Sequence, residues 1–179
     1  MYSKVKIAGH PLHVMLVAFP VAFYTAAFVC FLAYAFGAEP FWFRVGIYAN
    51  LAGVITAAIA AVPGFIDWAF GVPTGSPAKA TGLTHMACNV AALLLYLLNV
   101  FFQWGHRLET LPPVGLTVVL TGLGFALTLV AGFLGWKLVG THHVGVDLTP
   151  EQERLEPRAN PRVERHPPTP ELPHGQRVG

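Results

Sequence analysis

Four long apolar segments, almost free of ionic side chains, dominate residues 1–140 of this chain. They cover residues 14–37, 45–66, 86–102 and 114–136. The hydrocarbon core of a bilayer is about 30 Å thick, and a helix needs roughly 20 apolar residues to cross it. The sequence therefore predicts an all-α polytopic membrane protein, a bundle of four transmembrane helices with spans of about 12–37, 42–68, 85–104 and 113–139.

Composition excludes a water-soluble enzyme. Apolar residues make up 54% of the chain and charged residues 11%, with a mean hydropathy of +0.55, whereas soluble domains are roughly 25% charged. The net charge of +2 is weak and scattered, so nothing indicates a nucleic-acid partner. Cys30 and Cys88 lie in apolar runs without a CxxC spacing, which is typical of packing residues rather than of zinc ligands or a disulfide.

The last part of the chain has a different composition. Residues 146–179 contain five arginines, six acidic residues and seven prolines, and their aliphatic residues are scattered singly. Such a segment cannot bury enough apolar surface to offset the entropy lost on ordering. The sequence thus predicts a membrane domain over residues 1–145 and a disordered cytoplasmic tail over residues 146–179.

Lysines in the short loops predict the orientation. The N-terminus, the 67–85 loop and the end of the fourth span share one membrane face, called side A, and the 37–44 and 103–113 loops share the other, side B. Side A carries four lysines and side B two arginines: Lys4, Lys6, Lys79 and Lys137 against Arg44 and Arg107. Because cytoplasmic loops are enriched in Lys and Arg, we expect both termini in the cytoplasm.

Polar residues at the span ends gather on side A. They are His10, His13, Asp67, His85, Asn89, His142 and His143. Ionisable groups at the membrane are costly and normally have a partner. Imidazoles with a carboxylate suit a transition metal, and histidines also hold haem iron.

The hypothesis is therefore a redox-associated site at the cytoplasmic face. A metal ion would be bound by His13, Asp67, His85 and His142, with Asn89 or His10 orienting these ligands through hydrogen bonds. A haem b would draw its ligands from His10, His13, His85 and His142.

Other interpretations stay open. His10, His142 and His143 are also typical of interfacial histidines, and Asp67 can pair with Lys79 and fix the bundle. The protein would then be a non-catalytic scaffold that recruits partners through its tail. Ion passage lacks ionisable side chains in the middle of the first and fourth spans, and no Ser/His/Asp or HExxH arrangement indicates a hydrolase. Whether the chain is an enzyme, and whether it forms a homo-oligomer, stays open.

Several motifs together resemble a known family. They are 9–13 (GHPLH) followed by Phe19-Pro20, then 61–68 (AVPGFIDW), His85 with Asn89, and 138–146 with His142. This pattern, over about residues 7–146, resembles the bacterial membrane-protein family called domain of unknown function 2231. The resemblance implies a four-span protein of the bacterial inner membrane, in a family sometimes joined to a Rieske-type iron–sulfur domain. Electron transfer with a Rieske-type or other redox partner is the expectation that follows. The family usually has glycine where this chain has His143.

The predicted topology has a direct test. Reporter fusions placed after Gln176 and within the 103–113 loop should report opposite sides of the membrane, with the first in the cytoplasm. The same side for both fusions would contradict the four-span arrangement.

Overall fold

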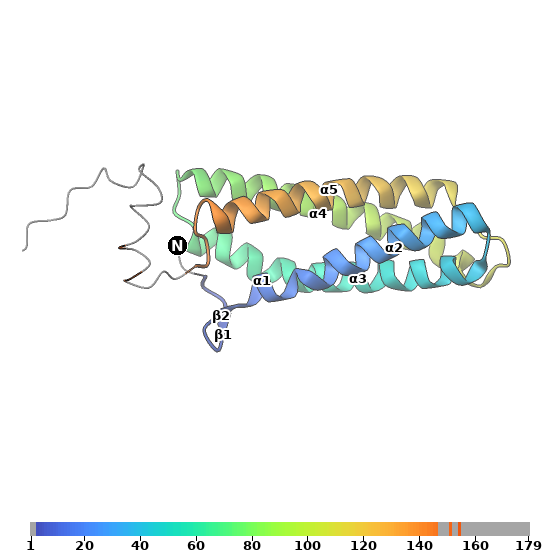
Figure 1. The fold of residues 1–179 in the computed structure, drawn as a ribbon, viewed down its shortest axis with the longest axis horizontal. Coiled ribbons are helices and arrows are strands. Elements are labelled where there is room, and N and C mark those ends of the chain that lie inside the picture. The colour runs from blue at the N-terminus through green and yellow to red at the C-terminus, as the bar shows by residue number, and fades with distance from the viewer. Residues whose placement is uncertain (1–2, 147–150, 152–153, 155–179) are drawn as a thin grey trace, which may run out of the picture. The chain divides into compact units, whose positions relative to one another are not determined.

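The computed structural model describes residues 3–146 together with Glu151 and Arg154. Contacts divide the chain into two units, Met1–Val146 and Asp147–Gly179. The predicted disorder of the tail therefore falls almost wholly outside the described residues and stays a prediction. The first unit contains four helical segments long and apolar enough to cross a membrane, lying side by side (Figure 1). The predicted fold class, an all-α bundle of four transmembrane helices, is confirmed.

The elements follow one another in chain order. A two-stranded antiparallel hairpin, β1 (Lys6–Ile7) and β2 (His10–Pro11), leads into α1 (Leu12–Leu16) and α2 (Ala18–Gly37), which together form the first span. The second span is α3 (Pro40–Ile66) with a π-helical turn, η1 (Asp67–Gly71). The third is α4 (Pro77–Gln103) with a 3₁₀ turn, η2 (Trp104–Leu108), and the fourth is α5 (Gly115–Gly140).

Prolines and one serine set the helix starts and one break. Pro40 and Pro77 begin α3 and α4, where a missing N–H costs no hydrogen bond. Ser76 caps α4 by accepting the Lys79 N–H at 3.2 Å, so this helix begins well before the predicted start at about residue 85. The first span is interrupted at Val17, three residues before Pro20, whose ring disfavours a regular helix through the preceding turn.

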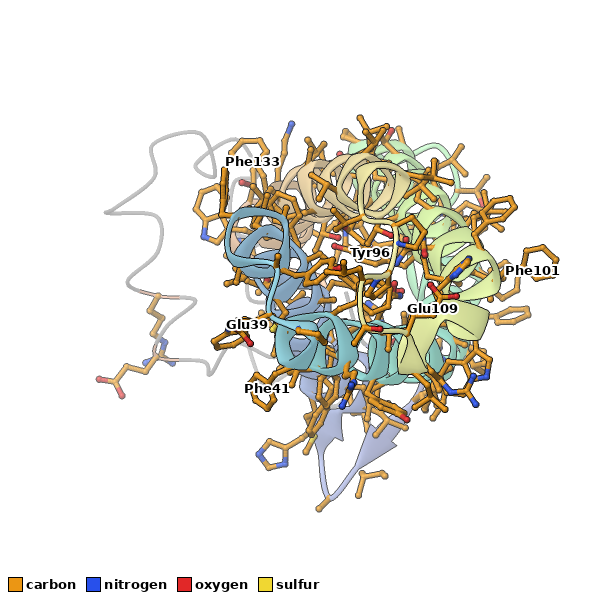
Figure 2. All side chains as sticks on the ribbon, turned by 90° about the vertical axis from the view of Figure 1, so that its right-hand side faces the viewer. Glu39, Phe41, Tyr96, Phe101, Glu109 and Phe133 are labelled. Carbon is orange, nitrogen blue, oxygen red and sulfur yellow. The ribbon has the colours of Figure 1, made fainter. Side chains whose placement is uncertain are left out.

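Small residues recur on the inner faces of the returning helices, and many large apolar residues face outward. The small or polar buried residues are Gly46, Asn50, Gly53 and Ala60 on α3, beside the larger Phe43, Ile47 and Pro63, and Thr117, Thr121, Gly124, Thr128 and Ala131 on α5. Figure 2 shows Tyr96 in the middle of the bundle, with Phe41, Phe101 and Phe133 at its periphery. Helices in lipid associate through close backbone approach, and this distribution supplies it.

The bundle consists of two similar halves, α1–α3 and α4–α5. His13 and Tyr24 in the first outgoing span correspond to His85 and Tyr96 in the second, each pair 72 residues apart. Along the returning helices the correspondence is 71 residues: Gly53, Ala60 and Gly64 match Gly124, Ala131 and Gly135. The halves also pack on each other reciprocally, α2 against α5 and α3 against α4. This is a parallel repeat about an approximate two-fold axis along the bundle.

The closest helix contacts predict which glycines tolerate a side chain. A Cβ on Gly53 would lie 2.5 Å from Cδ1 of Tyr24, and one on Gly124 2.7 Å from Cε2 of Tyr96. We expect Gly53→Ala and Gly124→Ala each to lower the free energy of unfolding by about 1–3 kcal/mol through overpacking. Thermal unfolding in detergent measures this loss.

Gly132→Ala is the matched control. Gly132 also lies in α5, but a Cβ there would have no neighbour within 4 Å. This variant should unfold at the same temperature as the unmodified protein or at a slightly higher one, since alanine is the better helix former. Equal losses in all three variants would contradict the importance of the glycine–tyrosine contacts.

Candidate functional site

The two halves bring one histidine each to the same end of the bundle. His13 on α1 directs Nδ1 at the Ala60 carbonyl oxygen at 2.8 Å, and His85 on α4 directs Nδ1 at the Ala131 carbonyl oxygen at 2.8 Å. A carbonyl oxygen only accepts, so Nδ1 carries the hydrogen in both rings. In a neutral imidazole this tautomer leaves the lone pair on Nε2.

A glycine makes room for each imidazole. A Cβ on Gly64 would lie 2.6 Å from Cε1 of His13, and one on Gly135 3.1 Å from Cε1 of His85. In each half the glycine follows, by four residues, the alanine whose carbonyl accepts the histidine hydrogen. One turn of a returning helix therefore supplies both the acceptor and the space for the ring.

The rings of His13 and His85 lie close to one another. Their centroids are 6.4 Å apart and their planes are nearly perpendicular, at 88°. Both side chains are half-buried. Asn89, one turn along α4, donates through Nδ2 to Nε2 of His85 at 3.1 Å and to its carbonyl at 2.9 Å. Asn89 thus occupies Nε2 of His85, the nitrogen that would bind a metal ion. The Asn89 side chain itself is exposed.

Asp67 binds the N-terminal segment. Its carboxylate accepts the Ser3 hydroxyl at 2.8 Å and the backbone N–H groups of Lys4 and Val5 at 2.6 and 3.2 Å. Lys79 does not pair with it. The Lys79 ammonium instead donates to the carbonyls of Trp68, Ala69 and Val72 and lies 4.2 Å from the centroid of the Trp68 ring. The Asp67–Lys79 pair considered from the sequence is therefore absent. Asp67 instead holds the N-terminal segment, an arrangement called the Asp67 clamp, and Lys79 binds the carbonyls at the end of the second span.

The other side-A histidines lie apart from the pair. His10 is exposed on β2, with Nδ1 3.0 Å from the Ala8 carbonyl oxygen, and His142 has Nε2 3.4 Å from the Thr81 hydroxyl. His143 has φ +54°, a conformation that glycine adopts without steric cost. Within residues 3–146, Glu151 and Arg154, no three His, Cys, Asp or Glu side chains lie close enough to hold a metal ion. The four-ligand metal site with Asn89 behind it stays a prediction.

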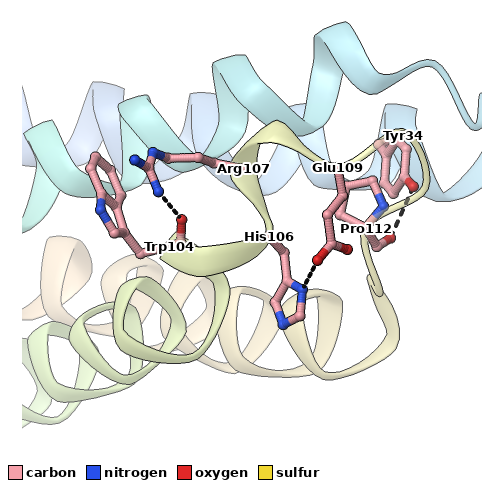
Figure 3. Close-up of polar contacts among 6 residues, drawn as sticks. All are labelled: Tyr34, Trp104, His106, Arg107, Glu109 and Pro112. Carbon is pink, nitrogen blue, oxygen red and sulfur yellow. Dashed lines mark hydrogen bonds and ion pairs between the residues drawn. The ribbon is translucent and has the colours of Figure 1, made fainter.

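On side B, polar contacts tie the α4–α5 loop together (Figure 3). His106 Nδ1 and a Glu109 carboxylate oxygen form a hydrogen bond of 2.8 Å, and Arg107 donates to the Trp104 carbonyl at 2.7 Å. Tyr34 on α2 donates to the Pro112 carbonyl at 2.9 Å and anchors the loop to the first half. These local roles make His106 a suitable control for the histidine pair.

Sequence reasoning missed a tyrosine pair in the membrane interior. The rings of Tyr24 and Tyr96 stack with centroids 3.7 Å apart and planes 2° apart. The Tyr96 hydroxyl donates to the backbone carbonyls of Tyr24 and Thr121, both at 3.2 Å. The 11-residue spacing from His13 to Tyr24 and from His85 to Tyr96 is the signal that identifies the pair.

The fold and these contacts define a multi-pass helical membrane protein built from two similar halves. A family model described as a predicted membrane protein, DUF2231, matches residues 9–148. The chain therefore belongs to this family, and the resemblance found from the sequence motifs is confirmed. No curated protein and no solved structure matches the chain.

The Asp67 clamp predicts how the N-terminal segment is held. Asp67→Ala removes the acceptor for three hydrogen bonds, so the segment around Ser3 and Val5 should detach and become sensitive to protease. Limited proteolysis with N-terminal sequencing measures the change. Glu109→Ala, which removes a carboxylate on side B, should leave that sensitivity unchanged. Resistance equal to the unmodified protein in Asp67→Ala would show that the clamp does not hold the segment.

Proposed function

We propose that this multi-pass membrane protein binds a transition-metal ion between His13 and His85. The single observation that carries the proposal is the pairing of two imidazoles, one from each half, with both Nδ1 atoms bonded to backbone carbonyls and 6.4 Å between ring centroids. Metal-binding histidines almost always donate their second N–H to a carbonyl or carboxylate, which fixes the ring and makes it a better ligand.

The spacing of the rings fits one shared ion. A nitrogen ligand lies about 2.0 Å from the metal, which puts the centroid of its ring about 3.2 Å away. Two rings whose Nε2 atoms face one ion from opposite sides would then have centroids about 6.4 Å apart, which equals the observed separation of 6.4 Å. Imidazole suits zinc, copper, iron and nickel. For His85 to bind, Asn89 has to release Nε2, which its exposed position permits.

An ion fits the pair better than haem b does. A haem between the rings would need a wide, flat slot, whereas Gly64 and Gly135 let the helix backbones approach both imidazoles closely. The grooves at Phe23, Arg44 and Tyr48 and at Leu16, Thr56 and Ile59 are formed by residues other than the pair. Asp67, His10 and His142 have hydrogen-bond partners of their own and would not bind the ion.

The wider setting is part of the same proposal. Side A would face the cytoplasm of a bacterial cell, with the bundle in the inner membrane. A copper or iron ion held by two neutral ligands keeps open positions. It could exchange electrons with a Rieske-type or other redox partner docked at side A.

Metal analysis of protein purified without chelator tests the site. The unmodified protein should contain one metal ion per chain, and His13→Ala and His85→Ala should each lose most of it. His106→Ala on side B should retain the ion. Asn89→Ala should bind at least as tightly, because it frees Nε2 of His85. The visible spectrum should lack a haem band.

The same series distinguishes the other interpretations. Loss of the ion in Asp67→Asn, with the fold intact, would favour the four-ligand site predicted from the sequence. A folded protein free of metal and haem, indifferent to both histidine substitutions, would favour a membrane scaffold.

A further inference from the structure

The half of the bundle nearer side B contains buried oxygens without a partner. Among the residues that the structure describes, the Tyr24 hydroxyl, Asn99 Oδ1, Gln103 Oε1 and the Thr117 hydroxyl are enclosed and make no hydrogen bond. The four side chains are at most 4% exposed. An unpaired polar group inside a membrane protein is unfavourable. Four of them in one region therefore indicate a ligand that pairs with them.

Three of these groups lie within about one helical turn of one another, on α4 and α5. Asn99 and Gln103 are one turn apart on the buried face of α4. Thr117 lies on the buried face of α5, one turn before Thr121, whose carbonyl accepts the Tyr96 hydroxyl. Because α5 runs opposite to α4, moving from Thr121 to Thr117 leads toward side B, as moving from Tyr96 to Gln103 does. Thr117 thus lies between the levels of Asn99 and Gln103.

The two-fold relation predicts that the Tyr24 hydroxyl lies beside them. The Tyr96 hydroxyl reaches the Tyr24 carbonyl near Thr121, so the Tyr24 hydroxyl should reach the Tyr96 carbonyl near Asn50, the counterpart of Thr121. The Asn50 amide already donates to that carbonyl at 3.1 Å. Asn99 in turn donates to Asn50 Oδ1 at 2.7 Å, leaving its own Oδ1 unpaired.

We propose that these groups form an internal hydration site, which binds water in the half of the bundle nearer side B. A water molecule can donate to the amide oxygens of Asn99 and Gln103 and accept from the Thr117 hydroxyl, and another can pair with the Tyr24 hydroxyl. Water is favoured over a metal cation because all of these groups are neutral, so a buried charge would stay uncompensated.

The first half of the bundle lacks this site. The counterparts of Asn99, Gln103 and Thr117 are Ala27, Phe31 and Gly46, which carry no side-chain hydrogen-bonding group. Since these residues allow the same helix packing, the fold does not require the polar groups. The site gives the Tyr24 hydroxyl contact with water near the middle of the membrane, while Tyr96, bonded to two carbonyls, stays dry.

Solid-state NMR of the full chain in lipid bilayers tests the proposal, using magnetisation transfer from water. Transfer to the side chains of Asn99 and Gln103 should be several-fold faster than to Ala27 and Phe31. The Tyr24 hydroxyl should likewise exchange with water several-fold faster than the Tyr96 hydroxyl. Equal, slow transfer to Asn99 and Ala27 would overturn the hydration site.

Two further arms complete the test. Replacing sodium and potassium with N-methylglucamine should leave the Asn99 and Gln103 carbonyl shifts unchanged, and a shift that returns with sodium would overturn water in favour of a cation. Thr117→Gly, which copies Gly46, should slow the transfer to Gln103 because the water loses a donor. Unchanged transfer in a folded variant would remove Thr117 from the site and overturn the proposed arrangement.

Discussion

The contact between a flat ring and a glycine backbone holds this bundle together. The tyrosine rings lie against Gly53 and Gly124 and the histidine rings against Gly64 and Gly135. Lipid tails are as apolar as the helices, so burial of apolar surface gives little reason to associate, and close approach of the backbones has to supply it. The two glycines of each returning helix lie 11 residues, or three turns, apart and therefore on one face. On this face one glycine contacts a tyrosine ring and the other a histidine ring, in both halves of the bundle.

Much of the fold could be predicted from hydropathy, because the bilayer demands long apolar helices. The limits of the helices could not, since Ser76 and Pro77 extend α4 through the polar residues Lys79, Thr81 and Thr84. Hydropathy averages such residues with the loop, whereas capping and tertiary contacts keep them helical. Small residues on α3 recur at steps of three or four, as at Gly46, Asn50 and Gly53, which is typical of a packing face. The correspondence between these residues and those of α5 is recognised only when the two helices are aligned with an offset of 71 residues.

The candidate site was predicted in part. Topology correctly brought His13 and His85 to one end, and the four-residue spacing put Asn89 beside His85. Sequence spacing does not show which acceptor a carboxylate or an ammonium group finds in the folded chain. In the folded chain Asp67 binds the N-terminal segment, and Lys79 donates to carbonyls within and directly after the π-helical turn.

The two-fold arrangement also says how such a chain can arise. A hairpin of two spans begins and ends on the same membrane face. Two copies can therefore be joined end to end with both keeping the same orientation in the membrane. A symmetric pair of separate hairpins and a single fused chain can then share one architecture, with a histidine from each copy meeting at the axis. Fusion frees the copies to diverge, since a substitution no longer appears twice. Asn99 opposite Ala27, and Gln103 opposite Phe31, are differences that a pair of identical hairpins could not carry.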